Sequence, residues 1–328
     1  MNEKMLNILK RDLEKINFFK KRHLLSAIKF TVLIILLVAT HVCVIIFIDK
    51  PYYIIFVVLW GILAVQFGLF AHEAGHRAAS NSSIVNKIYG YFSMPFVNGN
   101  NFTVWVDLHN QHHQYVQIEN MDPDMDFKIL LSVYPAQAKL KNKFLKKIQR
   151  FQQIYFWFIS LFFSWSFRLK SFDLIIKNPK KMKMDSVLII SHYFVWLGIP
   201  AIFIGFNLAL INYLFYSMVL SFYLAIIFSV NHIGLPTLSG VPQKMDFTKL
   251  QIEYSRNITN HKFLDFIFGG LNFQIEHHLF PGVSIRNLRN GSRIVSEFCK
   301  KNNFKYQTMC LLPALRQIYK HLYNMGRI

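Results

Sequence analysis

Most of the 13 histidines in this sequence fall in three short groups whose spacing suits metal binding. The groups read HEAGH, HNQHH and QIEHH. Residues three or four apart lie on the same face of a helix, so each group can direct its side chains to one point. The candidate ligands are His72 and His76 in the first group, His109, His112 and His113 in the second, and His277 and His278 in the third.

Two further residues extend this set. Gln274 occupies the place in the third group that His109 has in the second, and its amide oxygen can bind a metal or orient a water ligand. His232 follows the last long apolar run and adds another imidazole. Seven or eight imidazoles exceed the four ligands of a tetrahedral zinc ion and therefore predict two metal ions. Imidazole binds zinc, copper, iron and nickel, so the ligand type leaves the metal open.

The first histidine group by itself also fits a different enzyme. HEAGH satisfies the H-E-x-x-H pattern of zinc proteases, in which Glu73 would be the general base. An intramembrane protease of this kind needs His72 and His76 but not the two later groups. The three groups together favour the two-metal interpretation. A non-enzymatic membrane protein that stores or senses metal is the remaining alternative.

The other histidines have no partner at metal-binding spacing, and we expect packing or surface roles for them. His192 has a second interpretation, because ionisable groups inside membranes often face a functional polar interior. Asp122, Asp124 and Asp126 resemble the start of a calcium-binding loop, but Phe127 stands where that loop needs glycine. We expect a solvated turn there, or an acidic patch near the metal site. The histidines without a spaced partner are His23, His41, His192, His261 and His321.

The composition is that of a membrane protein. Hydrophobic residues make up 53% of the 328 residues, 33 of which are phenylalanine, and the mean hydropathy is +0.28. The formal net charge of +20 comes from basic segments beside apolar runs, as the positive-inside rule and anionic lipid headgroups favour. We therefore expect membrane lipids as partners and no nucleic acid. The three cysteines are far apart and indicate neither a disulfide framework nor a thiolate cluster.

Four apolar runs are long enough to cross roughly 30 Å of hydrocarbon as helices. We expect them to pair into two hairpins, because short turns near Pro51 and Asn207 join them. Basic residues are abundant before the first run and almost absent from the turns, which predicts that the N-terminus, the histidine groups and the C-terminus are cytoplasmic. The predicted spans are residues 28–48, 52–70, 186–206 and 209–230.

Three further segments have patterns of their own. Residues 151–167 are apolar, but both flanks are basic, so we expect a helix at the membrane surface and not a fifth span. Residues 88–97 are too short to cross and predict a re-entrant or interfacial segment. Residues 286–328 have the pattern of an amphipathic helix without a chemical motif.

An open two-metal site at a membrane surface, without another cofactor motif, is best explained by iron that activates O2 against a hydrocarbon chain. The three histidine groups, in this order and around two apolar hairpins, resemble the histidine boxes of the membrane fatty acid desaturases. The run NFQIEHHLFP, Asn272 to Pro281, is similar to the third box of the front-end acyl desaturases. The resemblance implies a non-haem di-iron enzyme that takes two vicinal hydrogens from an acyl chain. It implies iron ligands at His72, His76, His109, His112, His113, His277 and His278, with His232 as an additional one.

Two departures from that family matter. No His-Pro-Gly-Gly haem motif occurs, so we expect no fused cytochrome b5 domain and electrons from a separate donor of the ferredoxin or cytochrome b5 type with its reductase. Glu73 stands where relatives often have aspartate, and we expect it to hydrogen-bond a ligand imidazole. An acyl-lipid or acyl-CoA would be the substrate. A hydroxylase on the same scaffold would use the same ligands and differ only in its product.

These observations predict one all-α integral membrane domain over residues 1–328. Four transmembrane helices in two hairpins would carry a cytoplasmic helical cap, and the cap would hold a histidine-rich site with two irons. The predicted reaction is the O2-dependent desaturation of an acyl chain.

Overall fold

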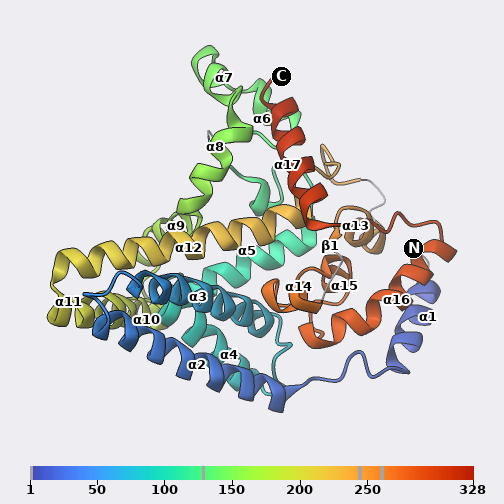
Figure 1. Ribbon diagram of the computed structural model, residues 1–328. Helices are drawn as coiled ribbons and strands as arrows, with labels where there is room; N and C mark the ends of the chain where they lie inside the picture. The colour runs from blue at the N-terminus through green and yellow to red at the C-terminus, as the bar shows by residue number, and fades with distance from the viewer. Residues whose placement is uncertain (1–2, 128–129, 243–245, 259–261) are drawn as a thin grey trace. The chain divides into compact units, whose positions relative to one another are not determined.

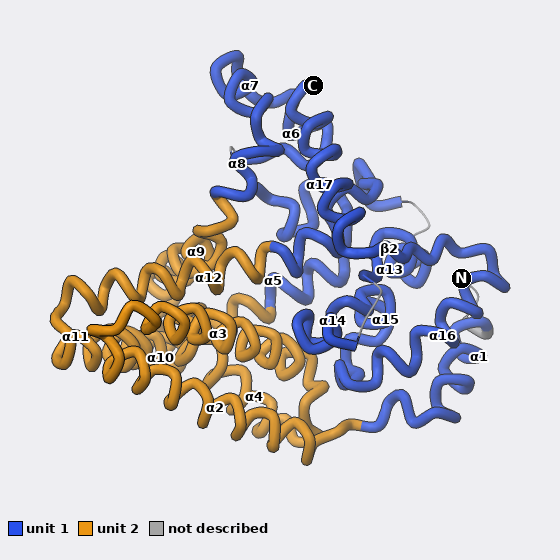
Figure 2. The backbone as a smooth tube through the Cα atoms, viewed as in Figure 1, with its two compact units in different colours: residues 1–20, 107–158, 226–328 blue, residues 21–106, 159–225 orange. Residues whose placement is uncertain are grey.

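A computed structural model describes residues 3–127, 130–242, 246–258 and 262–328 of the chain. The chain is mostly helical, and its residues form two compact units (Figures 1 and 2). Unit 1 comprises residues 1–20, 107–158 and 226–328, and unit 2 comprises residues 21–106 and 159–225. Helices α5 (Phe102–Tyr115) and α12 (Phe206–His232) each contribute residues to both units.

Unit 2 consists of long apolar helices. Its other elements are α2 (His23–Ile46), α3 (Tyr53–Gly75), α4 (Ser83–Tyr91), the π-helical turn η1 (Phe92–Val97), α9 (Phe163–Lys177), α10 (Lys183–Tyr193), the π-helical turn η4 (Phe194–Gly198) and α11 (Ile199–Ile204). Each π-helical turn lies at a proline, Pro95 inside η1 and Pro200 just after η4. Proline lacks the N–H that an α-helix needs, and a widened turn accommodates that loss.

Four helices in the described residues are long and apolar enough to cross a membrane, and they match the four predicted spans. They run from His23 to Ile46, Tyr53 to Gly75, Lys183 to Ile204 and Phe206 to His232. The boundaries differ from the prediction by up to five residues, and the largest differences are at the start of the first helix and the end of the second, where helical hydrogen bonding continues past the apolar run. α3 therefore extends to Gly75, with His76 as its C-cap, and α12 ends at His232.

Close packing holds the helices of unit 2 together. α2 lies alongside α3 (Figure 1). Gly61 of α3 faces α12, where a Cβ at this position would stand 2.6 Å from the Cβ of Val219. Next to it, the Trp60 ring stacks on the Tyr216 ring with centroids 3.9 Å apart. The missing side chain at Gly61 thus lets two membrane-length helices approach closely.

Unit 1 consists of shorter helices and one pair of short strands. Its remaining elements are α1 (Glu3–Glu14), the 3-10 turn η2 (Pro123–Met125), α6 (Pro135–Lys139), α7 (Lys143–Gln149), α8 (Gln152–Ile159), α13 (Phe247–Glu253), β1 (Asn257–Ile258), α14 (Lys262–Ile267), α15 (Gln274–Leu279), α16 (Ile285–Lys301), β2 (Thr308–Met309) and α17 (Leu311–Met325). β1 and β2 pair in parallel. The predicted C-terminal helix is therefore two helices with a short strand between them.

Amphipathic faces build the core of unit 1. Leu9 and Leu13 of α1 pack with Val295 of α16 and Ile275 of α15, and all four side chains are buried. Gly291 leaves room in α16 for the Phe18 ring, which a Cβ would approach to 2.3 Å. This core supports α15, the helix that carries the third histidine group.

The apolar segment predicted at the membrane surface is helical but interrupted. α8 ends at Ile159, a 3-10 turn η3 (Ser160–Phe162) follows, and α9 continues to Lys177. Neither α8 nor α9 is among the four membrane-length helices. The segment of residues 88–97 forms the end of α4 and the turn η1, which pack against α3.

Candidate metal centre

Helix α5 presents the second histidine group from one side of its last turns. His109, His112 and His113 have exposed fractions of 7%, 1% and 7%. The first turn of α5 is capped by Asp185, whose carboxylate accepts from the Phe102 backbone N–H at 2.7 Å. The predicted spacing of three and four residues along a helix is confirmed.

Three imidazoles of unit 1 form a first cluster around His113. The Nε2 atom of His113 lies 3.1 Å from Nε2 of His109 and 3.1 Å from Nε2 of His277. The candidate ligand atoms of these three residues all lie within 4.8 Å of one another. Residues of α5 and α15, which are 164 positions apart in the chain, thus meet at one point.

Three other imidazoles of unit 1 form a second cluster. His112 of α5, His232 at the end of α12 and His278 of α15 have ligand atoms within 4.8 Å of one another. Their ring centroids are 4.8 to 5.1 Å apart. The rings of His113 and His278 are 4.3 Å apart, so the two clusters are neighbours. Unit 1 alone therefore offers two sets of three imidazoles.

Asp122 orients one ligand of the second cluster. Its carboxylate accepts from Nδ1 of His112 at 2.8 Å and from the backbone N–H groups of Gln117 and Asp124 at 2.8 and 2.9 Å. The proton on Nδ1 leaves the Nε2 lone pair for a metal. Burial lowers the pKa of His112, but the charges of Asp122 and Asp124 outweigh it and raise that pKa to about 9.

Of the two expectations for this acidic stretch, the acidic patch fits the structure. Asp122 is only 3% exposed and lies against a candidate ligand, whereas a solvated turn would leave it in water. It starts the turn η2, which brings the chain back toward α5. The acidic pattern in the sequence thus pointed to a residue that contacts a candidate metal ligand, although this contact is unrelated to a calcium-binding loop.

Gln274 lies between His232 and Asn231. Its Oε1 accepts from Nδ2 of Asn231 at 3.0 Å, and its Nε2 lies 3.0 Å from Nε2 of His232. Asn231 also donates to the backbone carbonyl of Leu271 at 3.1 Å. In this arrangement Gln274 orients His232, and its role as a metal ligand stays a prediction.

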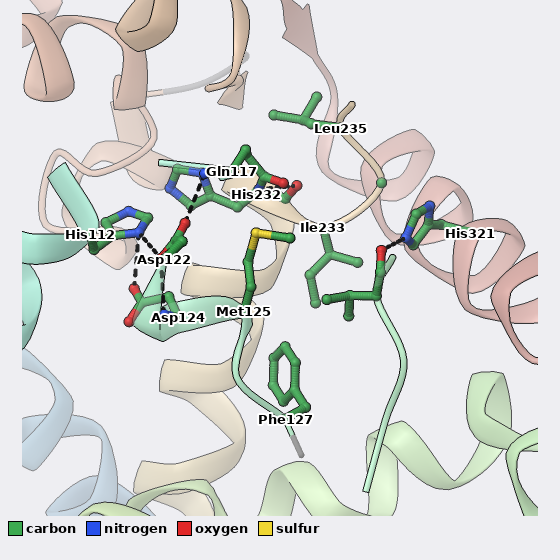
Figure 3. A pocket seen from close by; sticks show the side chains of 12 residues that line it. His112, Gln117, Asp122, Asp124, Met125, Phe127, His232, Ile233, Leu235 and His321 are labelled. Carbon is green, nitrogen blue, oxygen red and sulfur yellow. Dashed lines mark hydrogen bonds and ion pairs between the residues drawn. The ribbon is translucent and has the colours of Figure 1, made fainter. Parts of the chain in front are cut away.

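A pocket opens beside the second cluster (Figure 3). His112, Asp122 and His232 line one part of it, and the apolar side chains of Met125 and Phe127 line another (Figure 3). His321 is at its far edge, where Nε2 donates to the carbonyl of Val133 at 2.7 Å (Figure 3). The pocket thus lies next to two candidate ligands, His112 and His232.

The first histidine group lies at the end of α3, in unit 2. The rings of His72 and His76 are 4.9 Å apart, as expected for residues one helical turn apart. His72 is 3% exposed, and its ring lies 5.5 Å from that of Trp105. Glu73 is buried as well, with 2% of its surface exposed. Gly75 leaves the space that Trp105 fills, because a Cβ would stand 2.8 Å from that ring.

Among the described residues, the histidines without a spaced partner are not part of these clusters. His41 packs between the rings of Trp60 and Trp196, and His321 donates to a backbone carbonyl. His192 is fully buried in a polar part of unit 2, where its ring nitrogens contact Tyr213 OH at 2.7 Å and the Phe96 carbonyl at 3.0 Å. His23 is at the exposed start of α2, and His261 lies outside the described residues.

Several residues that contact the clusters or Gln274 are absent from the prediction. Gln251, Asn231 and Gln117 are not part of any histidine group, and each makes its contact through a single amide. Amides of this kind occur throughout a chain, so their residue type carries no signal by itself. Only the proximity created by folding distinguishes them.

Comparisons with known proteins agree with this geometry. The fatty acid desaturase family model matches residues 49–309 of the chain. A Delta(6)-fatty-acid desaturase of Caenorhabditis elegans is 28% identical over 275 residues, which cover 80% of this chain and 62% of that protein. A Delta(8)-fatty-acid desaturase of Euglena gracilis is 28% identical over 290 residues, covering 84% and 68%.

An acyl-lipid (9-3)-desaturase of Borago officinalis is 28% identical over 279 residues, covering 81% of this chain and 62% of that protein. The chain thus spans roughly three-fifths of the length of several curated relatives that it matches.

Proposed function

We propose that this chain, which belongs to the fatty acid desaturase family, introduces a double bond into an acyl chain in an O2-dependent reaction. The observation that carries the proposal is the pair of three-imidazole clusters in unit 1. Two adjacent sets of three imidazole donors are more than one metal ion requires. They suit a two-metal centre, which is the chemistry that the family uses on unreactive hydrocarbon.

The donor atoms in the first cluster fit metal ions. Two ligand nitrogens at right angles around an ion, each about 2.1 Å from it, stand about 3 Å apart. The Nε2 atoms of His109 and His277 each lie 3.1 Å from Nε2 of His113. In the second cluster, Nε2 of His278 is buried and makes no hydrogen bond to the described residues, as a nitrogen reserved for a metal would.

We assign the metal ligands to the histidine groups of both units. The two clusters of unit 1 supply six imidazoles, and His72 and His76 of unit 2 would supply two more. Their spacing of one helical turn and the burial of His72 support this assignment. The proposed ligands are His72, His76, His109, His112, His113, His232, His277 and His278, with Gln274 as a ligand or as the residue that orients His232.

Two bound irons would supply the oxidising power that removes two vicinal hydrogens as O2 is reduced to two waters. The balance requires two external electrons and two protons, so a redox partner of the ferredoxin or cytochrome b5 type is part of the proposal. This chain's residues hold and orient the ligands: Asp122 holds His112, and Gln274 holds His232. Burial of the imidazoles keeps bulk water away from the reacting carbon atoms.

We further propose that residues 1–328 act as one membrane domain. Its four spans would form two hairpins, and the short turns between α2 and α3 and between α11 and α12 support this. The N-terminus, the histidine groups and the C-terminus would face the cytoplasm, in agreement with the distribution of lysine and arginine. α8 would lie at the membrane surface.

The acyl carrier in the proposal is a glycerolipid or coenzyme A. The relatives' names support an acyl substrate, since they describe fatty acid and acyl-lipid desaturases. A hydroxylase would need the same ligands, so only the product distinguishes the two activities. A protease that uses only the HExxH motif would not explain the six clustered imidazoles of unit 1.

The decisive experiment expresses the full chain in a host of defined lipid content, with donor proteins supplied, and examines fatty acid derivatives by gas chromatography and mass spectrometry. We expect a new unsaturated fatty acid that disappears in the His113→Ala and His278→Ala variants. A hydroxylated fatty acid would show that the enzyme is a hydroxylase and not a desaturase. The absence of a new fatty acid product, together with proteolytic activity that survives both substitutions but not Glu73→Gln, would favour the protease.

A further inference from the structure

Gln251 connects the second and third histidine groups within unit 1. It lies on α13 and is fully buried. Its Oε1 lies 2.8 Å from Nδ1 of His278, and its Nε2 donates to the backbone carbonyl of His113 at 3.0 Å. One amide thus contacts one residue of each cluster.

The direction of these hydrogen bonds follows from chemistry. A backbone carbonyl can only accept, so the amide nitrogen of Gln251 must face His113. The amide oxygen then faces His278, and an oxygen of this kind can only accept. His278 must therefore carry its proton on Nδ1. Its lone pair is on Nε2, the buried nitrogen that has no partner among the described residues.

The same amide ties α15 to α5. α13 packs against α15, and Asp246 caps the start of α13 by accepting from the Lys249 backbone N–H at 3.1 Å. Gln251 is therefore held on an ordered helix, and its reach to His113 fixes the spacing between the two ligand-bearing helices. Asp122 does the equivalent for His112 with a carboxylate, whereas Gln251 does it without adding charge.

We propose that Gln251 is a positioning residue of the metal centre: it holds His278 in the tautomer that presents Nε2 to the metal and keeps α15 in register with α5. This inference rests on the metal centre of the proposed function. Partners that orient a ligand histidine typically change metal affinity by about 10- to 100-fold when they are removed. The change should thus be visible in metal binding, independently of turnover.

The test titrates Co²⁺ into the purified, metal-free full chain and follows the visible absorption of the bound ion. We expect Gln251→Leu to weaken binding by about 10- to 100-fold. Gln251→Glu keeps an acceptor for Nδ1 and should recover at least half of that loss on a logarithmic scale. Equal affinities for the Leu and Glu variants would overturn the proposal, as would wild-type affinity in Gln251→Leu.

Gln152 provides a matched control. It too is fully buried in unit 1, and its amide bridges backbone groups, accepting from Ser132 N–H at 2.9 Å and donating to the Leu322 carbonyl at 2.8 Å. Gln152→Leu should lower the melting temperature about as much as Gln251→Leu but leave Co²⁺ affinity unchanged. If both variants lose affinity equally, the effect is general destabilisation and the proposal is wrong.

The same preparations separate this inference from the proposed function. A wild-type chain that binds two metal ions, depends on Gln251 for affinity and forms no unsaturated product would retain the inference and reject the desaturase. A chain that forms the product while Gln251→Leu binds metal normally would retain the desaturase and reject the inference.

Discussion

At the scale of single residues, hydrogen bonds select the nitrogen that two of the imidazoles in the candidate site offer to a metal. Asp122 takes the Nδ1 proton of His112, and Gln251 takes that of His278. Each bond leaves Nε2 as the lone-pair donor. The ligands alone would be free to rotate or to change tautomer, so these partners are as much a part of the site as the imidazoles.

Asp122→Ala tests this at the carboxylate. The substitution removes the acceptor for three donors, of which His112 Nδ1 is the one next to the metal site. We expect a loss of about 10- to 100-fold in desaturation and a lower iron content per chain, measured by product analysis and metal analysis. Asp173→Ala, which removes a carboxylate that pairs with Lys177 at the surface, should change neither value.

Because His321 is largely buried, we expect the stability of the folded protein to depend on pH. Burial lowers the pKa of His321, so between that lowered pKa and the unfolded value of about 6.5 only the unfolded chain takes up the proton. Stability should therefore decrease as the pH falls below about 6.5. His321→Gln, which can still donate to Val133, should show a shallower decrease in melting temperature between pH 7 and 5. Identical slopes would contradict the argument, and His23→Gln at the exposed start of α2 is the control.

At the scale of elements, each helix does a separate part of the work. α5 brings three imidazoles to one side, α15 brings two, and α12 ends where His232 is needed. In unit 2, π-helical turns accommodate Pro95 and Pro200, and α11 continues directly after the second of these turns. Close helix contacts then hold these elements in place, and glycine is needed where two backbones approach.

Gly61→Ala should separate α3 from α12. The new Cβ would meet Val219 Cβ at 2.6 Å and the Tyr216 carbonyl oxygen at 3.0 Å, and neither atom is at the end of a flexible side chain. Overpacking of this kind costs about 1–3 kcal/mol, so we expect a lower melting temperature of the detergent-purified protein. Gly240→Ala has open space around it and should melt like the wild type. An unchanged melting temperature for Gly61→Ala would contradict the packing.

We expect helix α8 and the residue before it to contact lipid headgroups and the adjoining part of the acyl chains. Phe151, Ile154 and Phe158 are exposed by 59%, 59% and 64%, and no acidic residue occurs between Asp126 and Asp173. Exposed aromatic and basic residues together are typical of helices at the membrane interface. A fluorescent label at Phe158→Cys in reconstituted protein should be quenched by nitroxide lipids and protected from aqueous iodide. A label at Lys301→Cys, at the exposed end of α16, should show the reverse.

At the scale of the whole molecule, the proposed ligands occur in both compact units. Unit 1 holds six of the proposed ligand imidazoles, and unit 2 holds two. The chain passes between the units several times, so each unit is built from segments far apart in the sequence. Membrane-length helices belong mostly to unit 2, while the short helices and the strand pair belong to unit 1.

The proposed sidedness can be tested with membrane-impermeant maleimide on intact cells. Cys310 is exposed in unit 1 and should react only after the membrane is permeabilised. A cysteine at the exposed Lys50, in the turn between α2 and α3, should react from the outside without permeabilisation. Labelling of both sites from the same side would contradict the proposed arrangement of the three spans that lie between them.

The sequence by itself determined the four membrane-length helices, the three histidine groups and the family. These features are local: hydrophobic length and helical spacing involve residues a few positions apart, so a linear pattern contains them. It also marked Asp122, because Asp122, Asp124 and Asp126 resemble the start of a calcium-binding loop, but left its role open between a solvated turn and an acidic patch near the site.

Only the tertiary structure decided how the imidazoles divide into two clusters and which residues orient them. Gln251 is 27 residues from His278 and 138 residues from His113, and nothing in the sequence between them encodes that contact. Such contacts form because α13, α15 and α5 pack around one buried polar site, where each donor must find an acceptor. Hydrogen-bond partners over these distances are a product of the fold, whereas spans and spacings are properties of the chain.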